Sequence, residues 1–401
     1  MLGKFQFKGE TAKDLKETLF SLIFCTFGDL ITGITMGFFS HKLNALPALM
    51  VLIPPAIGMR GNIFASLGSR LGTYFYTGEI VIGKKNKILG ENIMATFAQT
   101  FTMSFYIGII AWIIAQHFGM KNVSITDLAL ISLLAGVFSA FLLLFFTFAI
   151  AFSSYKRGWN PDNLTAPLIT LAGDITTLPL LFFSMEIVVV VGKEIKVAML
   201  AFFLLLSIFS LLLSSRKVNA KRIVIESIPV LLICGLLSSF SGSILGMKAE
   251  EILSVAAILT IIPAFLEDGG AIGGILAARF STYLHTGEIR YGEKLPKKAI
   301  SLFILMHLEG LIIFPLIGIF GFIAGSYMGL PTYSILRMIL ISLIAGEIMV
   351  LIVNFLSFYV VMLSYKVGMD PDNVTIPILT SLMDFIGTAC LIGVTFFLYP
   401  A

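Results

Sequence analysis

Long apolar runs, separated by short polar segments, follow one another from end to end of the 401-residue chain. A run of about 20 apolar residues can cross the hydrocarbon core of a bilayer as an α-helix. Hydropathy and loop signals predict eleven such spans. Their approximate ranges are 17–39, 44–76, 92–117, 127–153, 164–191, 197–215, 223–243, 251–284, 299–325, 333–364 and 374–399. The pattern therefore predicts an all-α, polytopic membrane protein.

Two spans, 44–76 and 251–284, are longer than one crossing requires, and each contains proline followed by glycine. Such helices are tilted or broken in membrane proteins. In the first of them, Pro54-Pro55 with Gly58 and Gly61 predicts a break near the middle of the membrane.

Composition supports the membrane prediction, because 58% of the residues are hydrophobic and only 12% are charged. A soluble domain of this size cannot bury so much apolar surface. The three cysteines lie in apolar runs and form no metal-binding or disulfide pattern. The first apolar run lacks a small-residue cleavage site, which favours a retained span over a signal peptide.

Positive charges are distributed unequally between the loops on the two sides of the predicted membrane. Eighteen Lys and Arg residues lie in the N-terminal segment and the loops that share its side, whereas six lie on the opposite side. Cytoplasmic loops are enriched in Lys and Arg. The distribution predicts a cell-membrane protein with a cytoplasmic N-terminus and an external C-terminus.

The chain also contains an internal duplication. A first set of residues recurs 209 positions later and a second set 210 positions later. Pro54, Gly61, Arg70 and Gly78-Glu79 match Pro263, Gly270, Arg279 and Gly287-Glu288; Pro161-Asp162-Asn163, Thr170 and Asp174 match Pro371-Asp372-Asn373, Thr380 and Asp384. The matches predict two repeats, at 15–191 and 223–399.

Each repeat contains five predicted spans, so direct fusion would invert the second repeat. The additional span at 197–215, within a linking segment 192–222, restores the orientation. We therefore expect two parallel five-helix repeats joined by a linking transmembrane helix, related by a pseudo-twofold axis along the membrane normal. Such a chain would work as a monomeric pseudo-dimer.

Asp174 and Asp384 are the first candidates for chemistry, because both lie about ten residues into the fifth span of a repeat. A carboxylate at this depth costs about 2.5–3.5 kcal/mol on insertion scales. Two carboxylates that face each other across the axis repel unless a cation lies between them. Thr170 and Thr380, one helical turn earlier, could add oxygen ligands. The alternative is that each Asp is buried and bonded to neighbouring hydroxyls.

Further candidates for the metal pathway lie in other spans. Asn62, after Gly61, could present an amide oxygen, although small residues around it could equally serve helix packing. Asp29 has Ser238 at its repeat equivalent, and Glu267-Asp268 match a neutral pair. Glu309 and Glu347 also lack acidic equivalents. A pore wall, a coupling-ion site or an internal salt bridge would each explain these unpaired acids.

These motifs carry a family resemblance. The segment PPAIGMRGNIFASLGSRLGT from Pro54, its counterpart from Pro263, the two Pro-Asp-Asn loops and the fifth spans resemble the MgtE transmembrane domain. Their fusion resembles the solute carrier family 41 branch of magnesium transporters. The resemblance implies that Asp174 and Asp384 bind a central hydrated magnesium ion. The second repeat departs from the pattern, with Gly270-Ala271 in place of Gly-Asn.

The sequence therefore predicts transport of divalent cations, first Mg²⁺, through a pathway lined by paired aspartates. The alternative is an exchanger that couples Na⁺ or H⁺ to Mg²⁺, Mn²⁺ or Ca²⁺. A membrane-embedded enzyme is least favoured, because no nucleophile or catalytic histidine accompanies the aspartates. We expect the divalent ion and the lipid bilayer as partners, no nucleic acid, and no cofactor.

Overall fold

The computed structural model describes residues 9–76, 78–80, 86–120, 123–156, 161–285, 287–292, 294–367 and 371–399, and these ranges contain helices and no strand. The long helices are α1 (Gly9–Phe38), α3 (Ala48–Tyr76), α4 (Lys87–His117), α5 (Ile125–Lys156), α6 (Pro161–Val190), α7 (Lys193–Ser215), α8 (Val218–Met247), α10 (Ile262–His285), α11 (Lys297–Tyr327), α12 (Ile335–Lys366) and α13 (Pro371–Leu398). The short ones are α2 (Ser40–Ala45), α9 (Ala249–Ser254) and the 3₁₀ helix η1 (Ala256–Thr260). The predicted all-α class is confirmed.

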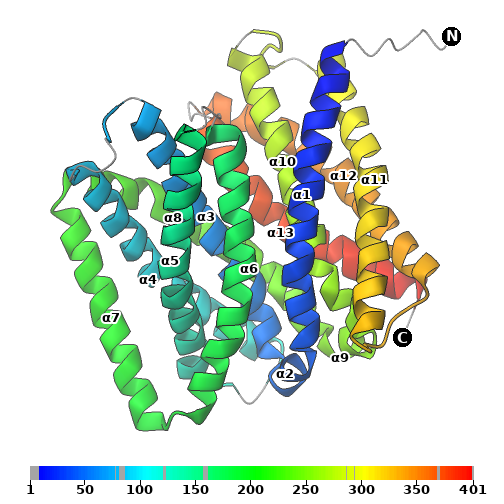
Figure 1. The fold of residues 1–401 in the computed structure, drawn as a ribbon. Helices are drawn as coiled ribbons and strands as arrows, with labels where there is room; N and C mark the ends of the chain where they lie inside the picture. The colour runs from blue at the N-terminus through cyan, green and yellow to red at the C-terminus, as the bar shows by residue number, and fades with distance from the viewer. Residues whose placement is uncertain are drawn as a thin grey trace.

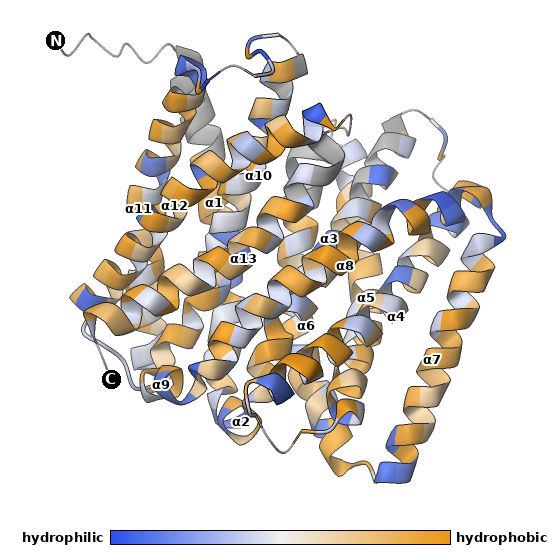
Figure 2. Ribbon diagram, turned by 180° about the vertical axis from the view of Figure 1, so that it is seen from behind, coloured by the Kyte–Doolittle hydropathy of each residue, from blue (hydrophilic) through white to orange (hydrophobic). Residues whose placement is uncertain are grey.

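Within the described ranges, nine helices are long and apolar enough to cross a bilayer. The long helices α1 and α10 are not among these nine, and α10 carries Glu267, Asp268 and Arg279. Figure 2 shows apolar residues along the outer faces of the bundle. A polytopic membrane protein is confirmed, whereas eleven crossings and the parallel arrangement of the repeats stay predictions.

The helix break expected at Pro54-Pro55 is in a different place. The chain bends at Leu46 and Pro47, between α2 and α3, and α3 continues through both prolines. Pro54 and Pro55 are the seventh and eighth residues of α3, and each removes a backbone hydrogen bond to the carbonyl four residues earlier. Membrane helices tolerate such prolines, because neighbouring helices and polar side chains can satisfy the freed carbonyls. In the second half, η1 interrupts the predicted 251–284 span before α10.

The first helix of each predicted repeat packs against helices of the other repeat. Helix α1 contacts α10, α11 and η1 as well as α6, and α8 contacts α3, α4 and α13. Figure 1 shows α1 beside α10 and α11. The two halves are therefore joined through exchanged helices, and each repeat is completed by α1 or α8 of the other.

Glycines permit the close approach of these exchanged helices. Gly33 of α1 lies against the backbone carbonyl of Thr260, and Gly242 of α8 lies against the backbone carbonyl of Val51. A Cβ atom at either glycine would overlap that carbonyl oxygen. Gly33 and Gly242 are 209 positions apart, as are Val51 and Thr260, so the two contacts correspond.

Helix α7 lies at the edge of the bundle (Figure 1). It packs on α4, α5 and α8, and Thr102 and Ser207 form a hydroxyl–hydroxyl hydrogen bond of 3.1 Å between α4 and α7. Lys196 pairs with Asp127 at 2.7 Å near the start of α5. The face of α7 that points away from α4, α5 and α8 is apolar and exposed, as a helix in contact with lipid requires. The limits proposed for the linking segment, 192–222, stay predictions.

We predict that Gly33→Ala or Gly242→Ala destabilises the protein by about 1–3 kcal/mol, because the new methyl group must displace backbone. Gly393→Ala is the control, since a Cβ atom there meets nothing within 4 Å. It should be neutral or stabilising, because alanine favours helix more than glycine does. Thermal unfolding in detergent measures all three, and equal melting temperatures would contradict the exchanged-helix contact.

Candidate functional site

The two repeated aspartates lie on α6 and α13, which pack against glycines of α3 and α10. A Cβ atom at Gly61 would lie 3.0 Å from Thr170 Cγ2, and one at Gly270 would lie 3.5 Å from Thr380 Cβ. These contacts correspond under the duplication. They place Thr170 and Thr380 at the helix–helix seams, where the Thr380 hydroxyl donates to the Pro377 carbonyl at 3.0 Å. A role for either hydroxyl as a metal ligand stays a prediction.

Five acids from four helices form what we call the acidic cluster: Asp29, Asp174, Glu267, Asp268 and Asp384. The carboxyl groups of Asp29 and Asp174 lie within hydrogen-bonding reach of each other. The charge of Glu267 acts on each of the other four acids, and Asp384 also acts on Asp174. The structure thus brings together five of the eight predicted metal-site residues.

Asn62 follows Gly61 on α3 and is half-buried. Its approach to the acidic cluster stays a prediction.

The cluster is asymmetric, although its parts come from equivalent positions. The Ser238 hydroxyl donates to Asp384 Oδ2 at 2.7 Å, and Ser238 is the equivalent of Asp29. A Cβ atom at Gly58 would lie 3.4 Å from the same Asp384 oxygen, and Gly58 is the equivalent of Glu267. Asp384 therefore has a neutral hydroxyl and a glycine where Asp174 has two further acids.

Asp268 is 0% exposed and is held by the exchanged helix α1. The Thr26 hydroxyl donates to Asp268 Oδ2 at 2.7 Å, and it also lies 2.7 Å from the Leu22 carbonyl oxygen. The equivalent place in the other half is apolar, because Gly235 there lies against the Met59 side chain. The seam between α1 and α10 is therefore polar where the seam between α8 and α3 is not.

Several oxygens of the cluster are buried without a hydrogen-bond partner. They are both carboxylate oxygens of Asp29, and Oδ1 of Asp174 and of Asp268. Asp29 is 0% exposed and Asp174 is 3% exposed. A buried carboxylate without a partner is strongly unfavourable, and it is compensated by protonation, by an ion pair or by a bound metal ion.

Two cations of α3, Arg60 and Arg70, are engaged away from the acidic cluster. Arg60 and Arg70 of α3 both donate to α4, to the Ser104 hydroxyl and, at 2.8 Å, to Asn92 Oδ1. Among the ion pairs of the described residues, none includes an acid of the cluster. The described residues also contain no group of three or more His, Cys, Asp or Glu arranged to hold a metal directly.

Glu309 and Glu347 lie outside the acidic cluster, on α11 and α12. Glu309 is fully buried, and Glu347 Oε2 lies 2.6 Å from His307 Nδ1. Of the two oxygens of Glu347, Oε2 is therefore accounted for by a contact with His307, whereas Oε1 is buried without a hydrogen-bond partner.

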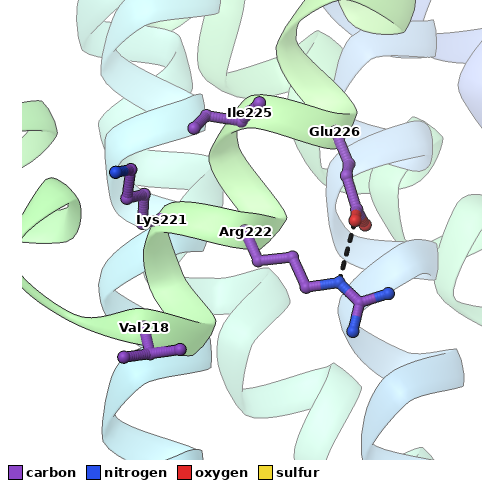
Figure 3. Close-up of a pocket in the computed structure, with 5 residues that line it drawn as sticks. All are labelled: Val218, Lys221, Arg222, Ile225 and Glu226. Atoms are coloured by element: carbon purple, nitrogen blue, oxygen red, sulfur yellow. Dashed lines mark hydrogen bonds and ion pairs between the residues drawn. The ribbon is translucent and has the colours of Figure 1, made fainter.

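A surface hollow of about 450 Å³ lies at the start of α8, lined by Val218, Lys221, Arg222, Ile225 and Glu226 (Figure 3). Arg222 Nε and Glu226 Oε1 are 2.8 Å apart, within one helix. Arg222 precedes Ser238 by sixteen residues, roughly 24 Å along the helix axis. The hollow is therefore distant from the acidic cluster.

The sequence did not predict two hydrogen bonds of the cluster, from Ser238 to Asp384 and from Thr26 to Asp268. Ser238 was identified as the equivalent of Asp29, but its hydrogen bond to Asp384 was not. Thr26 lies three residues before Asp29, on the same helix face, which is the signal that could have indicated it.

We predict that Thr26→Val destabilises the protein by about 1.5–3 kcal/mol, because Asp268 would lose a hydrogen-bond donor in a buried site. Thr35→Val on the same helix is the control, since the Thr35 hydroxyl donates only to the Ile31 carbonyl of its own helix. Its cost should stay below about 1 kcal/mol. Thermal unfolding in detergent compares the two variants, and similar losses would argue against a specific Thr26–Asp268 contact.

Comparison with known proteins identifies the family of the chain. The family model MgtE, described as a divalent cation transporter, matches residues 53–184 and 262–394. Solute carrier family 41 member 3 of Mus musculus is 27% identical over 398 residues, which cover 91% of this chain and 78% of that protein. Member 2 of Gallus gallus is 26% identical over 409 residues, covering 94% of this chain and 69% of the relative. No solved structure matches the chain.

The two matched regions together cover more than half of the chain, and the predicted resemblance is confirmed. Because the family consists of transporters, the expectation that the chain is not an enzyme is confirmed as well. The chain is a multi-pass membrane protein of the MgtE family of divalent cation transporters, with two MgtE regions in one polypeptide.

Proposed function

We propose that this protein carries Mg²⁺ across the cell membrane along a path through the acidic cluster, with Asp174 and Asp384 contributing charge from the two repeats. The observation that carries the proposal is the burial of carboxylate oxygens with no protein partner. Mg²⁺ prefers oxygen ligands, is commonly held by one or two carboxylates and retains several waters. The proposal takes support from the family match and from the relatives in solute carrier family 41.

Charge provides the selection against monovalent ions, because each carboxylate attracts a doubly charged ion twice as strongly at equal distance. The membrane potential provides an inward force of about 4.6 kcal/mol per 100 mV for two charges. This force is sufficient for uptake without a coupling ion. The positive loops support a cytoplasmic N-terminus, and the duplication supports a single chain as the working unit.

Exchange is the second candidate function. The acidic cluster contains more carboxylates than one divalent ion needs for charge balance, which leaves capacity for a coupling cation such as Na⁺ or H⁺. Exchange of Mn²⁺ or Ca²⁺ would use the same oxygens. Mg²⁺ flux into liposomes with and without a Na⁺ or H⁺ gradient distinguishes the two candidates.

We predict that Mg²⁺ flux into liposomes is at least tenfold lower for the double variant Asp174→Asn/Asp384→Asn than for the wild type, because both repeats lose the charge that attracts the ion. Asp127→Asn is the control, since Asp127 pairs with Lys196 at the start of α5 and not with the acidic cluster. It should transport at the wild-type rate. Wild-type flux in the double variant, reconstituted to the same density, would disprove the proposed pathway.

We also predict that Mg²⁺ stabilises the purified protein against thermal unfolding more than Na⁺ does at equal ionic strength. A ligand that binds only the folded state contributes about 2.7 kcal/mol at 100 times its dissociation constant. The stabilisation should be absent from the double variant. An equal response of both proteins would mean that Mg²⁺ binds away from these aspartates.

A further inference from the structure

Two corners of the acidic cluster correspond under the duplication and differ in charge. One corner joins Asp174 of α6 with Asp29 of α1 and Glu267 of α10. The other joins Asp384 of α13 with the equivalents Ser238 of α8 and Gly58 of α3. With all carboxylates ionised, the first corner carries three negative charges and the second carries one.

At the second corner the protein itself supplies a partner for one carboxylate oxygen. The Ser238 hydroxyl donates to Asp384 Oδ2 at 2.7 Å, and Asp384 is half-buried, whereas the Asp29 side chain is wholly removed from solvent. Gly58 offers no side chain that could add charge. A neutral donor next to a single carboxylate forms a stable arrangement without an ion.

The first corner has no such compensation. The carboxyl groups of Asp29 and Asp174 are within hydrogen-bonding reach, yet neither can donate while both are ionised. Both oxygens of Asp29 and Oδ1 of Asp174 are buried and unpartnered, and Glu267 adds a third charge that acts on both residues. Three acids in this arrangement require positive charge between them.

We infer that the divalent-cation site lies off the pseudo-twofold axis, at the corner formed by Asp29, Asp174 and Glu267. Asp29 and Asp174 bind the ion, which keeps part of its water shell, and Glu267 supplies charge. Asp384 remains bonded to Ser238 and acts on the ion through its charge at a distance. The inference rests on the proposed function, and it departs from a symmetric site in which the two repeated aspartates are equal.

The unequal roles are tested by Mg²⁺ binding to the purified full chain, measured by calorimetry. Asp29→Asn should weaken Mg²⁺ binding at least tenfold, whereas Asp384→Asn should weaken it less than threefold. Ser238→Ala, at the position equivalent to Asp29, should change the affinity less than twofold. Equal losses for Asp29→Asn and Asp384→Asn, or wild-type affinity of Asp29→Asn, would overturn the off-axis site.

Stability without divalent ions provides a second readout that a purely structural role would not give. In EDTA, Asp29→Asn should unfold at a higher temperature than wild type, because it removes repulsion from an empty site. Asp384→Asn should unfold at the same or a lower temperature, because its carboxylate accepts the Ser238 hydrogen bond. A lower melting temperature of Asp29→Asn would mean that Asp29 and Asp174 share a proton as a structural bond, which excludes the inference.

The two proposals fail in different ways. If the double variant Asp174→Asn/Asp384→Asn transports normally, the proposed function is wrong. If that variant loses flux while Asp29→Asn binds Mg²⁺ like the wild type, only the off-axis site is wrong.

Discussion

Mutual repulsion among carboxylates, none of which forms an ion pair within the described part of the chain, is the constraint on which the centre of this protein depends. The acidic cluster gathers five acids, and the oxygens of Asp29 are fully removed from solvent. In a medium of low dielectric constant such carboxylates must be neutralised, by protons or by a nearby cation. Under the proposed function the transported ion supplies this positive charge, so that ion binding and protein stability are linked.

The exchanged helices α1 and α8 create this centre. Because α1 packs against α10, it brings Thr26 and Asp29 to Asp268 and to the neighbourhood of Glu267. The equivalent helix α8 brings Ser238 to Asp384. A common backbone arrangement thus presents acids at one seam and small or neutral residues at the other. Divergence of a few side chains after duplication is sufficient to make two equivalent corners chemically different.

Much of this architecture can be derived from the sequence, because membrane helices are encoded by local hydropathy. The positions of the long helices, and the pairing of Asp174 with Asp384 by the duplication, follow from pattern alone. Pro54-Pro55 misled the prediction, because a membrane helix can continue through proline where its neighbours satisfy the freed carbonyls, and the sequence does not show those neighbours. The packing of α1 and α8 against the other repeat could not be predicted, because the close contacts at Gly33 and Gly242 join segments about 200 residues apart. The hydrogen bonds of Ser238 and Thr26 depend on that packing.

The exchange of α1 also has a consequence for biogenesis. Asp29 leaves the ribosome more than 200 residues before Asp268 and the rest of α10. At ordinary rates of translation, α1 must wait on the order of 10–50 s for α10 to be synthesised. During that interval Thr26 has no Asp268 to which it can donate, and α1 can pack only on helices of the first half, such as α6. The amino-terminal half of the protein therefore reaches its final arrangement only after most of the carboxy-terminal half has been made.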